Sequence, residues 1–263
     1  MQVIWGLIGL TVAALGLSFL GAMLPLGDSL AVLRAGLCLI LLALAVAAQV
    51  PRSWRFALLG LGFAGLSTVL WHKVPLSDPG PVTIYQKNMF HANTDLSGLA
   101  KDILAVGPDF VTLQEVSVVN GLLLQRLKAA YPHQHLCRSD TRGGVAVLSR
   151  IAPVGDGVCA VGFGMARITV DLPNGRHHVA AVHLAWPFPG AQPRQMELLI
   201  AELERLDAPF FLGGDFNMVP WSSALSRVAR ASGTQRAGPA LTTFLMGFLP
   251  ISIDHVFAPD GGA

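Results

Sequence analysis

The first 74 residues of the chain hold only five charged side chains, and no other feature of the sequence limits the possible folds so strongly. Three apolar runs lie in this part, at residues 3–24, 30–50 and 56–71. The first two reach the roughly 20 residues that a helix needs to cross a bilayer, and the third is slightly shorter. We therefore expect residues 1–74 to form about three transmembrane helices.

Two other interpretations of these runs fit the sequence less well. A cleaved signal peptide begins with a basic segment, but no Lys or Arg precedes the first run, and a second long run follows at once. A buried helical hairpin of a soluble protein would seldom contain a stretch such as LCLILLALAVAA, at residues 37–48, without one charge. A multi-pass membrane segment is the favoured interpretation.

The charges between the runs indicate how this segment would cross a membrane. Arg52 and Arg55 lie between the second and third runs, whereas the first connection carries only Asp28. Because loops rich in Lys and Arg stay in the cytoplasm, we expect the chain after Trp71 on the extracytoplasmic side. Residues 75–81 contain three prolines and one glycine, a composition typical of a linker.

Residues 82–263 show the alternation of strand and helix patterns that is typical of an α/β domain. The strand patterns lie at residues 82–88, 109–115, 143–150, 165–172, 177–184, 210–214 and 252–257, and the helical patterns at 95–107, 118–131 and 192–206. Asn174-Gly175 suits a two-residue hairpin turn, and a hairpin within this alternation predicts a mixed sheet. After residue 74 the 14 Lys and Arg nearly balance the 15 Asp and Glu, which argues against a broad nucleic-acid-binding face.

Several predicted strands end in a polar group of a kind that binds metal ions or phosphate. These groups are Asn88, Glu115, His183, Asp215, Asn217 and Asp254. Each has an ordinary explanation as a turn former, a helix-start acid, a core histidine or a capping carboxylate, although Asp254 is costly in an apolar strand unless it is paired. Their shared position predicts a site, because strands hold the residues at their ends rigidly. The glycines before Asp215 are expected to allow close approach of the backbone to a substrate.

The motifs LQE, GGVAVLSR, VHL, GGDFN and IDHVF occur in this order within residues 81–257. In this they resemble the endonuclease/exonuclease/phosphatase superfamily, which includes DNases, abasic-site endonucleases and neutral sphingomyelinases. The resemblance implies a four-layer α/β/β/α sandwich of two mixed sheets over residues 82–263. Bacterial membrane-anchored members are the most similar type, which implies a multi-pass protein of the bacterial inner membrane with its catalytic domain on the periplasmic or extracellular side.

The resemblance also implies a metal site. Glu115 matches the main ligand of Mg²⁺ or Mn²⁺ in the family, and Asn88 matches an asparagine beside the metal. This agrees with the chemistry of the residues, because a hard cation prefers oxygen ligands. We therefore expect Mg²⁺ or Mn²⁺ as the cofactor.

The other four groups match residues that act on the substrate. His183 and Asn217 match positions that contact the phosphate, and Asp215 matches the acid that orients or deprotonates the attacking water. Asp254 matches a carboxylate that orients a final catalytic histidine. The types fit phosphodiester hydrolysis, which needs a base for water and neutral donors for the charge that gathers on phosphorus.

The family normally ends with a Ser-Asp-His motif, whereas only APDGGA follows Phe257 in this sequence. In one register Asp254 belongs to the penultimate motif and the catalytic histidine is missing. In the other register Asp254-His255 is itself the terminal pair. IDHVF resembles the penultimate motif, which favours the first register and predicts a C-terminally truncated chain with weak or no activity.

We expect a membrane-anchored, metal-dependent phosphohydrolase that cleaves phosphodiester or phosphomonoester bonds as a monomer. Its substrate would be a nucleic acid, a phospholipid head group or a small phosphate ester. The alternative is a non-catalytic, membrane-tethered binding module that lacks the terminal motif. Cys137 and Cys159 either pair in an oxidising compartment or remain free thiols, and the sequence favours neither outcome.

Overall fold

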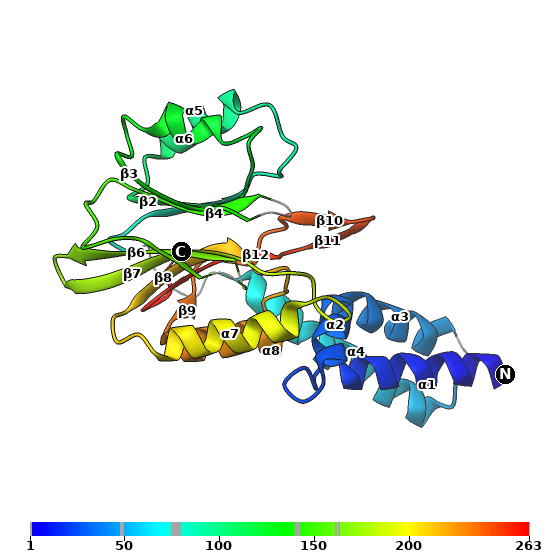
Figure 1. The fold of residues 1–263 in the computed structure, drawn as a ribbon. Helices are drawn as coiled ribbons and strands as arrows, with labels where there is room; N and C mark the ends of the chain where they lie inside the picture. The colour runs from blue at the N-terminus through cyan, green and yellow to red at the C-terminus, as the bar shows by residue number, and fades with distance from the viewer. Residues whose placement is uncertain are drawn as a thin grey trace.

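The computed structural model describes residues 2–47, 50–74, 80–139, 143–160, 162 and 164–262. An N-terminal helical unit lies at one side of two facing β-sheets, and helices cover the outer face of each sheet (Figure 1). The predicted mixed α/β fold is thus confirmed, and its layers follow the order helices, sheet, sheet, helices.

The helical unit consists of four α-helices and one short 3-10 helix, which pack around a small apolar core. The core includes Ile8, Leu15, Cys38, Leu41 and Leu58. The elements are α1 (Gln2–Leu17), α2 (Pro25–Val32), α3 (Arg34–Ala47), α4 (Arg52–Leu70) and η1 (Trp71–Lys73).

The expectation of about three membrane-spanning helices is wrong for the part of the chain that the structure describes. Only Arg52–Lys73, with 22 residues, is long and apolar enough to cross a bilayer as one helix. The second apolar run is broken into α2 and α3, which are bent by 67°, and α1 is a shorter apolar helix of 16 residues. The break has a physical cause, because polar groups of α2 bond to the sheet-containing part of the protein and hold this helix off the axis of α3.

The smaller sheet has four strands in the order β1-β2-β4-β3. Its strands are β1 (Ile84–Asn88), β2 (Phe110–Val116), β3 (His133–Cys137) and β4 (Gly144–Ser149). β1 and β2 are parallel and the other pairs are antiparallel. Two helices, α5 (Ser97–Val106) and α6 (Leu122–Leu127), cover its outer face with Ile103, Leu123 and Leu127.

The larger sheet has six strands in the order β5-β6-β7-β8-β12-β9, of which only β7 and β8 form a parallel pair. Its strands are β5 (Val158–Ala160), β6 (Met165–Leu172), β7 (Gly175–His183), β8 (Phe210–Asp215), β9 (Gln235–Arg236) and β12 (Asp254–Ala258). α7 (Gln192–Glu204) and α8 (Ser223–Ser232) cover its outer face, and the hairpin of β10 (Phe244–Met246) and β11 (Leu249–Ile251) lies beside it. The turn between β6 and β7 consists of Pro173 and Asn174, one residue earlier than the sequence suggested.

The two sheets pack face to face through apolar side chains of both, such as Phe110, Val147, Ile168 and Phe211. The two sheets lie close together at Gly213 of β8. A Cβ atom there would overlap Thr112 Oγ1 of β2 and lie 3.1 Å from Thr112 Cβ. The glycine therefore allows the two sheets to approach each other, which corrects the expectation that it serves the approach of a substrate.

A disulfide joins Cys137 of β3 to Cys159 of β5 and thereby links the edge strands of the two sheets. The sequence patterns had revealed neither strand, because β3 carries two histidines and a glutamine and β5 has only three residues. His135 Nε2 lies 3.3 Å and 3.5 Å from the two sulfur atoms. The choice between paired and free thiols is thus decided in favour of the pair.

Loss of this disulfide should destabilise the domain. Its cysteines are 22 residues apart, and a loop of about this length implies a loss of about 3 kcal/mol in the free energy of unfolding for Cys137→Ser with Cys159→Ser. Chemical denaturation of the full chain in detergent, with and without a reducing agent, measures it. The reducing agent should weaken the wild type and leave the double variant unchanged; equal curves for oxidised and reduced wild type would contradict the assignment.

Candidate active site

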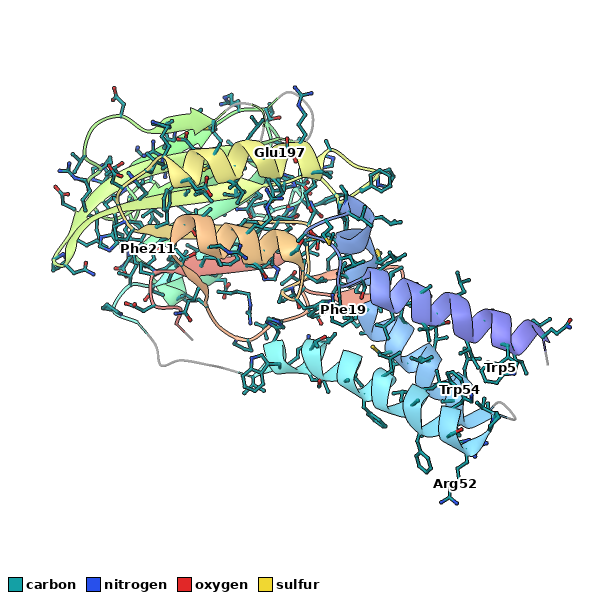
Figure 2. The ribbon with its side chains drawn as sticks, turned by 90° about the horizontal axis from the view of Figure 1, so that it is seen from below. Trp5, Phe19, Arg52, Trp54, Glu197 and Phe211 are labelled. Carbon is teal, nitrogen blue, oxygen red and sulfur yellow. A yellow bond between two sulfur atoms is a disulfide. The ribbon has the colours of Figure 1, made fainter. Side chains whose placement is uncertain are left out.

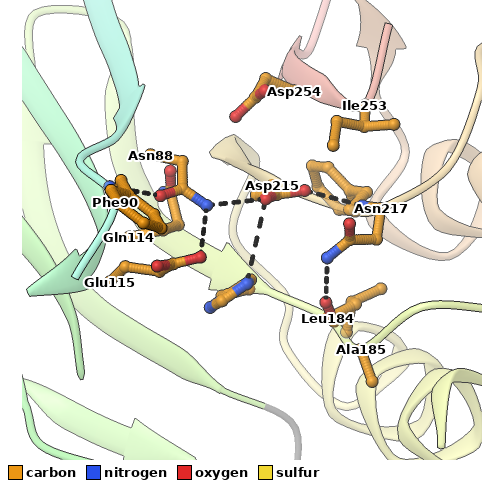
Figure 3. A network of polar contacts seen from close by, with 12 residues as sticks. Asn88, Phe90, Gln114, Glu115, Leu184, Ala185, Asp215, Asn217, Ile253 and Asp254 are labelled. Atoms are coloured by element: carbon orange, nitrogen blue, oxygen red, sulfur yellow. Dashed lines mark hydrogen bonds and ion pairs between the residues drawn. The ribbon is translucent and has the colours of Figure 1, made fainter. Parts of the chain in front are cut away.

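The six polar groups singled out in the sequence lie on neighbouring strand ends. In the larger sheet His183 pairs with Asp215 across β7 and β8, and Asp215 pairs with Asp254 across β8 and β12. In the smaller sheet Asn88 ends β1 opposite Gln114 of β2. Because the two sheets face each other, one polar network joins Asn88, Glu115, His183, Asp215 and Asn217, and Asp254 lies beside it (Figure 3).

Asn88 joins the two halves of this network. Its Nδ2 donates to Asp215 Oδ2 at 2.8 Å and to Glu115 Oε1 at 3.1 Å, so two carboxylates from different sheets converge on one amide nitrogen (Figure 3). Its Oδ1 accepts from the backbone N–H of Phe90 at 2.9 Å, which fixes the orientation of the amide. The amide thus occupies the space between two acids.

Glu115 is held in an unusual backbone conformation. Its φ is +56°, where residues other than glycine are uncommon, and the pairing of β2 with β4 is irregular between Leu113 and Val116. The bulge turns the Glu115 side chain toward the site. Burial raises the pKa of Glu115, but hydrogen bonds from His91 and Asn88 outweigh burial and lower the net pKa, so this carboxylate is charged at neutral pH.

His91 is a site residue that the sequence analysis missed. Its backbone N–H donates to Glu115 Oε2 at 2.9 Å, and its Nδ1 lies 2.8 Å from the same oxygen. His91 follows β1 in an irregular loop, where no strand pattern marks it. Only its spacing of three residues from Asn88 could have drawn attention to it.

Asp215 is the most deeply buried acid of the site, with 4% of its surface exposed. Its Oδ1 accepts from the backbone N–H of Asn217 at 2.9 Å, and its Oδ2 lies 3.9 Å from His183 Nε2. Burial, and then the nearby Asp254 carboxylate, raise the pKa of Asp215 to about 7. This carboxyl can therefore exchange a proton near neutral pH.

Asp254 faces the smaller sheet through two glutamines that the sequence analysis did not single out. Gln86 Nε2 donates to Asp254 Oδ1 at 2.8 Å and to Gln114 Oε1 at 2.7 Å. Gln114 Nε2 in turn donates to the carbonyl of Gly213 at 3.4 Å. These amides link β1, β2, β8 and β12, so they join the sheets directly behind the acids.

Asn217 and His255 belong to the structure around the acids. Asn217 has a φ of +49°, and its Nδ2 donates to the carbonyl of Leu184 at 2.7 Å. This bond ties the loop after β8 to the loop after β7. His255 lies on the other side of β12 from Asp254, and its Nε2 donates to the carbonyl of Met218 at 2.7 Å. Complete burial lowers the pKa of His255 to about 3, so its ring is neutral.

A cleft of about 560 Å³ opens beside the network. Its lining includes His183 and Asn217, together with Arg138, Trp186 and Gln195. The Cys137–Cys159 disulfide borders the same cleft. The cleft is large enough for a small organic group attached to a phosphate.

The donor set fits a hard divalent cation. Glu115 and Asp215 place carboxylate oxygens on either side of the Asn88 amide, and Asp254 pairs with Asp215 across β8 and β12. Among the described residues, only His135, Cys137 and Cys159 place three ligand atoms of His, Cys or carboxylates within 4.8 Å of one another, and two of them form the disulfide. A cation on Glu115 would thus have few protein ligands and keep water, as Mg²⁺ commonly does.

Comparisons with known proteins agree with this fold. The model of the Endonuclease/Exonuclease/phosphatase family matches residues 86–263, which is more than half of the chain. The chain therefore belongs to the endonuclease/exonuclease/phosphatase family, as its motifs indicated. No curated protein matches the chain in sequence.

Solved structures share the fold at low sequence identity. A Staphylococcus aureus beta toxin mutant with bound magnesium ions is 18% identical with a TM-score of 0.52, and the match covers 68% of this chain and 84% of the toxin. Sphingomyelinase C from Streptomyces griseocarneus is 21% identical with a TM-score of 0.51, covering 69% and 85%. A family protein from Leptotrichia buccalis is 16% identical with a TM-score of 0.54, covering 68% and 88%.

The raised pKa of Asp215 predicts how the stability of the metal-free protein depends on pH. When the pKa of a carboxyl is higher in the folded than in the unfolded state, the group contributes to the free energy of unfolding. This contribution is fully present below the unfolded pKa of about 3.9 and is lost as pH rises through the folded pKa. With a chelator present, the melting temperature of the wild type should therefore fall more steeply between about pH 5 and pH 8 than that of Asp215→Asn. Thermal denaturation of both proteins measures this, and parallel curves would contradict the assigned shift.

Proposed function

We propose that this protein is a divalent-metal-dependent phosphodiesterase anchored in a membrane. The observation that carries the proposal is the convergence of Glu115 and Asp215, from two sheets, on the amide of Asn88. Family membership supports hydrolysis of phosphate esters, and the magnesium ions of the beta toxin structure support Mg²⁺ as the cofactor.

In this proposal Glu115 and Asn88 would hold the cation, which when bound would supply positive charge to the phosphate. Asp215 takes a proton from water, whose oxygen attacks phosphorus while the bond to the leaving oxygen breaks. His183 Nε2, 3.9 Å from Asp215, is placed to donate to the phosphate. Asn217 holds Asp215 through its backbone N–H, and burial, followed by the nearby Asp254 carboxylate, raises the pKa of Asp215 far enough for proton transfer.

Membrane anchoring rests on the helical unit. Arg52, Trp54 and Trp5 lie at the end of this unit away from the sheets, where Trp5 and Trp54 are in edge-to-face contact at 6.2 Å (Figure 2). A cluster of tryptophan and arginine at one end of an apolar helical unit is typical of the cytoplasmic interface. The disulfide supports an oxidising compartment for the other end, namely the extracytoplasmic side.

A membrane-anchored cleft favours a phosphate ester at the membrane surface, such as a phospholipid head group, over a long nucleic acid. The near balance of acidic and basic residues after residue 74 supports the same choice, because a broad basic face would be needed for nucleic acid. The substrate class proposed is thus a lipid-linked phosphodiester.

Hydrolysis of bis(p-nitrophenyl) phosphate by the full chain in detergent with Mg²⁺ tests the activity itself. Asp215→Ala should lower kcat by about 10² to 10⁴, because it removes the proposed base. Asp171→Ala is the matched control, since Asp171 is an exposed acid at the opposite end of the larger sheet. Wild-type turnover that Asp215→Ala leaves intact would contradict the proposal.

Metal binding provides a second test, which does not depend on turnover. Calorimetry with Mg²⁺ or Mn²⁺ should show binding to the wild type that Glu115→Gln weakens at least about 10-fold. Glu197→Gln, at an exposed acid of α7, should bind as the wild type does. Equal affinities in the wild type and Glu115→Gln would rule out Glu115 as the ligand.

The orientation in the membrane can be read from reporters fused after Ala263. A reporter that is active only after export should be active there, because Arg52 and Arg55 are expected to keep the far end of the helical unit in the cytoplasm. A reporter that is active only in the cytoplasm is the paired control and should be silent. The opposite pattern would overturn the proposed orientation.

A further inference from the structure

The helix α2 lies in the apolar N-terminal part of the chain but packs into the core of the sheet-containing part. Ala31 and Val32 are buried in the same hydrophobic cluster as Phe216, Met218 and Val219. These three residues belong to the loop that directly follows Asp215. α2 therefore shares a hydrophobic core with the loop that carries Asn217.

Polar contacts fasten the far end of the same loop to α2. Asp28 accepts hydrogen bonds from the backbone N–H of Ser223 at 2.8 Å and of Ala224 at 3.0 Å, and from Ser223 Oγ at 2.8 Å. Ser223 and Ala224 are the first residues of α8, where the N–H groups have no partner within the helix. A carboxylate is favourable at this position because the helix dipole is positive there.

Trp221, two residues before the start of α8, provides a second connection. Its Nε1 donates to the carbonyl of Ala31 at 2.7 Å, and its own carbonyl accepts from Arg34 Nη1 at 3.5 Å. Arg34 is buried and also bonds Ser18, through Nε to Oγ at 3.0 Å and through Nη2 to the carbonyl oxygen. The loop after Asp215 thus ends on hydrogen bonds from α2 and the start of α3.

The loop after His183 is also held by α2. Ser29 Oγ donates to the carbonyl of Phe188 at 2.6 Å, five residues beyond His183. The two loops bond each other through Asn217 and Leu184. α2 therefore contacts the segments that follow His183 and Asp215, the two residues that act on the phosphate and the water in the proposed function.

We propose that α2 is a positioning element of the active site, and that Asp28 acts through the N-terminus of α8 to hold the loop of Asp215 and Asn217. The effect of α2 on catalysis rests on the proposed function, whereas the hydrogen bonds between α2 and the loop are observed independently of it. The N-terminal unit is then more than an anchor, because the geometry for proton transfer depends on it. α2 makes none of these contacts to β1 or β2, which carry Asn88 and Glu115.

Gly21 offers a way to disturb this link from outside the loop. A Cβ atom on Gly21 would overlap the Asp28 carboxylate and lie 2.8 Å from Ser223 Oγ. Gly21→Ala should therefore displace Asp28 from α8, as Asp28→Ala removes its acceptors. Gly16→Ala is the matched control in the same apolar region, because no atom lies within 4 Å of its Cβ position.

The test uses the full chain in detergent and two measurements. Hydrogen exchange should be faster at the amides of residues 216–225 in Asp28→Ala and Gly21→Ala, and unchanged in β1 and β2. With bis(p-nitrophenyl) phosphate, kcat should fall about 10- to 10²-fold, because a displacement of about 1 Å has this effect on a positioned group. KM and the Mn²⁺ affinity should stay within about twofold of the wild type, since Glu115 lies outside the contact.

The proposal would be overturned if Asp28→Ala and Gly21→Ala had the loop exchange rates and kcat of the wild type. It would also be overturned if Gly16→Ala showed the same changes as these variants, or if hydrogen exchange became faster evenly over both sheets. Asp28→Asn retains one acceptor oxygen and should lose less activity than Asp28→Ala. If the wild type shows no turnover, the proposed function is wrong. Hydrogen exchange at the loop amides in the same variants then tests, without any activity, whether α2 holds the loop.

Discussion

The site depends on the close contact between the two sheets at Gly213 and Thr112. Because Gly213 has no side chain, β8 lies against β2, and the amides of Gln86 and Gln114 can bridge the sheets to Asp254 and to the carbonyl of Gly213. The same proximity lets Asn88 reach Asp215. A wider separation would leave Glu115 and Asp215 as two unrelated acids on different sheets.

This arrangement brings like charges together in a partly buried place, which is unfavourable without compensation. The structure compensates with donors to each acid: His91 and Asn88 for Glu115, and the backbone of Asn217 for Asp215. Glu115 and Asn217 both have positive φ, and such conformations persist where the surroundings impose them, often at functional sites. The fold thus keeps three carboxyl groups at a position where a cation would relieve their repulsion.

Much of the sheet domain could be predicted from its sequence, because its central strands are apolar and end in polar residues. The order of the strand-end groups indicated the family. It also predicted that one site contains Asn88, Glu115, His183, Asp215, Asn217 and Asp254. β3 and β5 escaped prediction because β3 is polar and β5 is very short, whereas α8 was overlooked although Ser222 caps its start and Gly233 follows its end. His91 and Gln86 could not be found either, because their importance comes from tertiary contacts with Glu115 and Asp254.

The helical unit shows that hydrophobic composition alone does not predict how helices are broken and packed. Hydrophobicity predicted continuous spans, but it carries no information on where Asp28 finds its partner 195 residues away. That contact and the core position of Ala31 and Val32 explain why α2 bends away from α3.

The central claim is that a cation binds at Glu115 and Asn88, where Asp215 of the other sheet faces them. Anomalous diffraction from crystals of the full chain grown with Mn²⁺ tests it most directly. We predict a single strong peak within bonding distance of the Glu115 carboxylate and on the side that faces Asp215. Manganese bound elsewhere, for example at His135, with no peak at Glu115, would contradict the account.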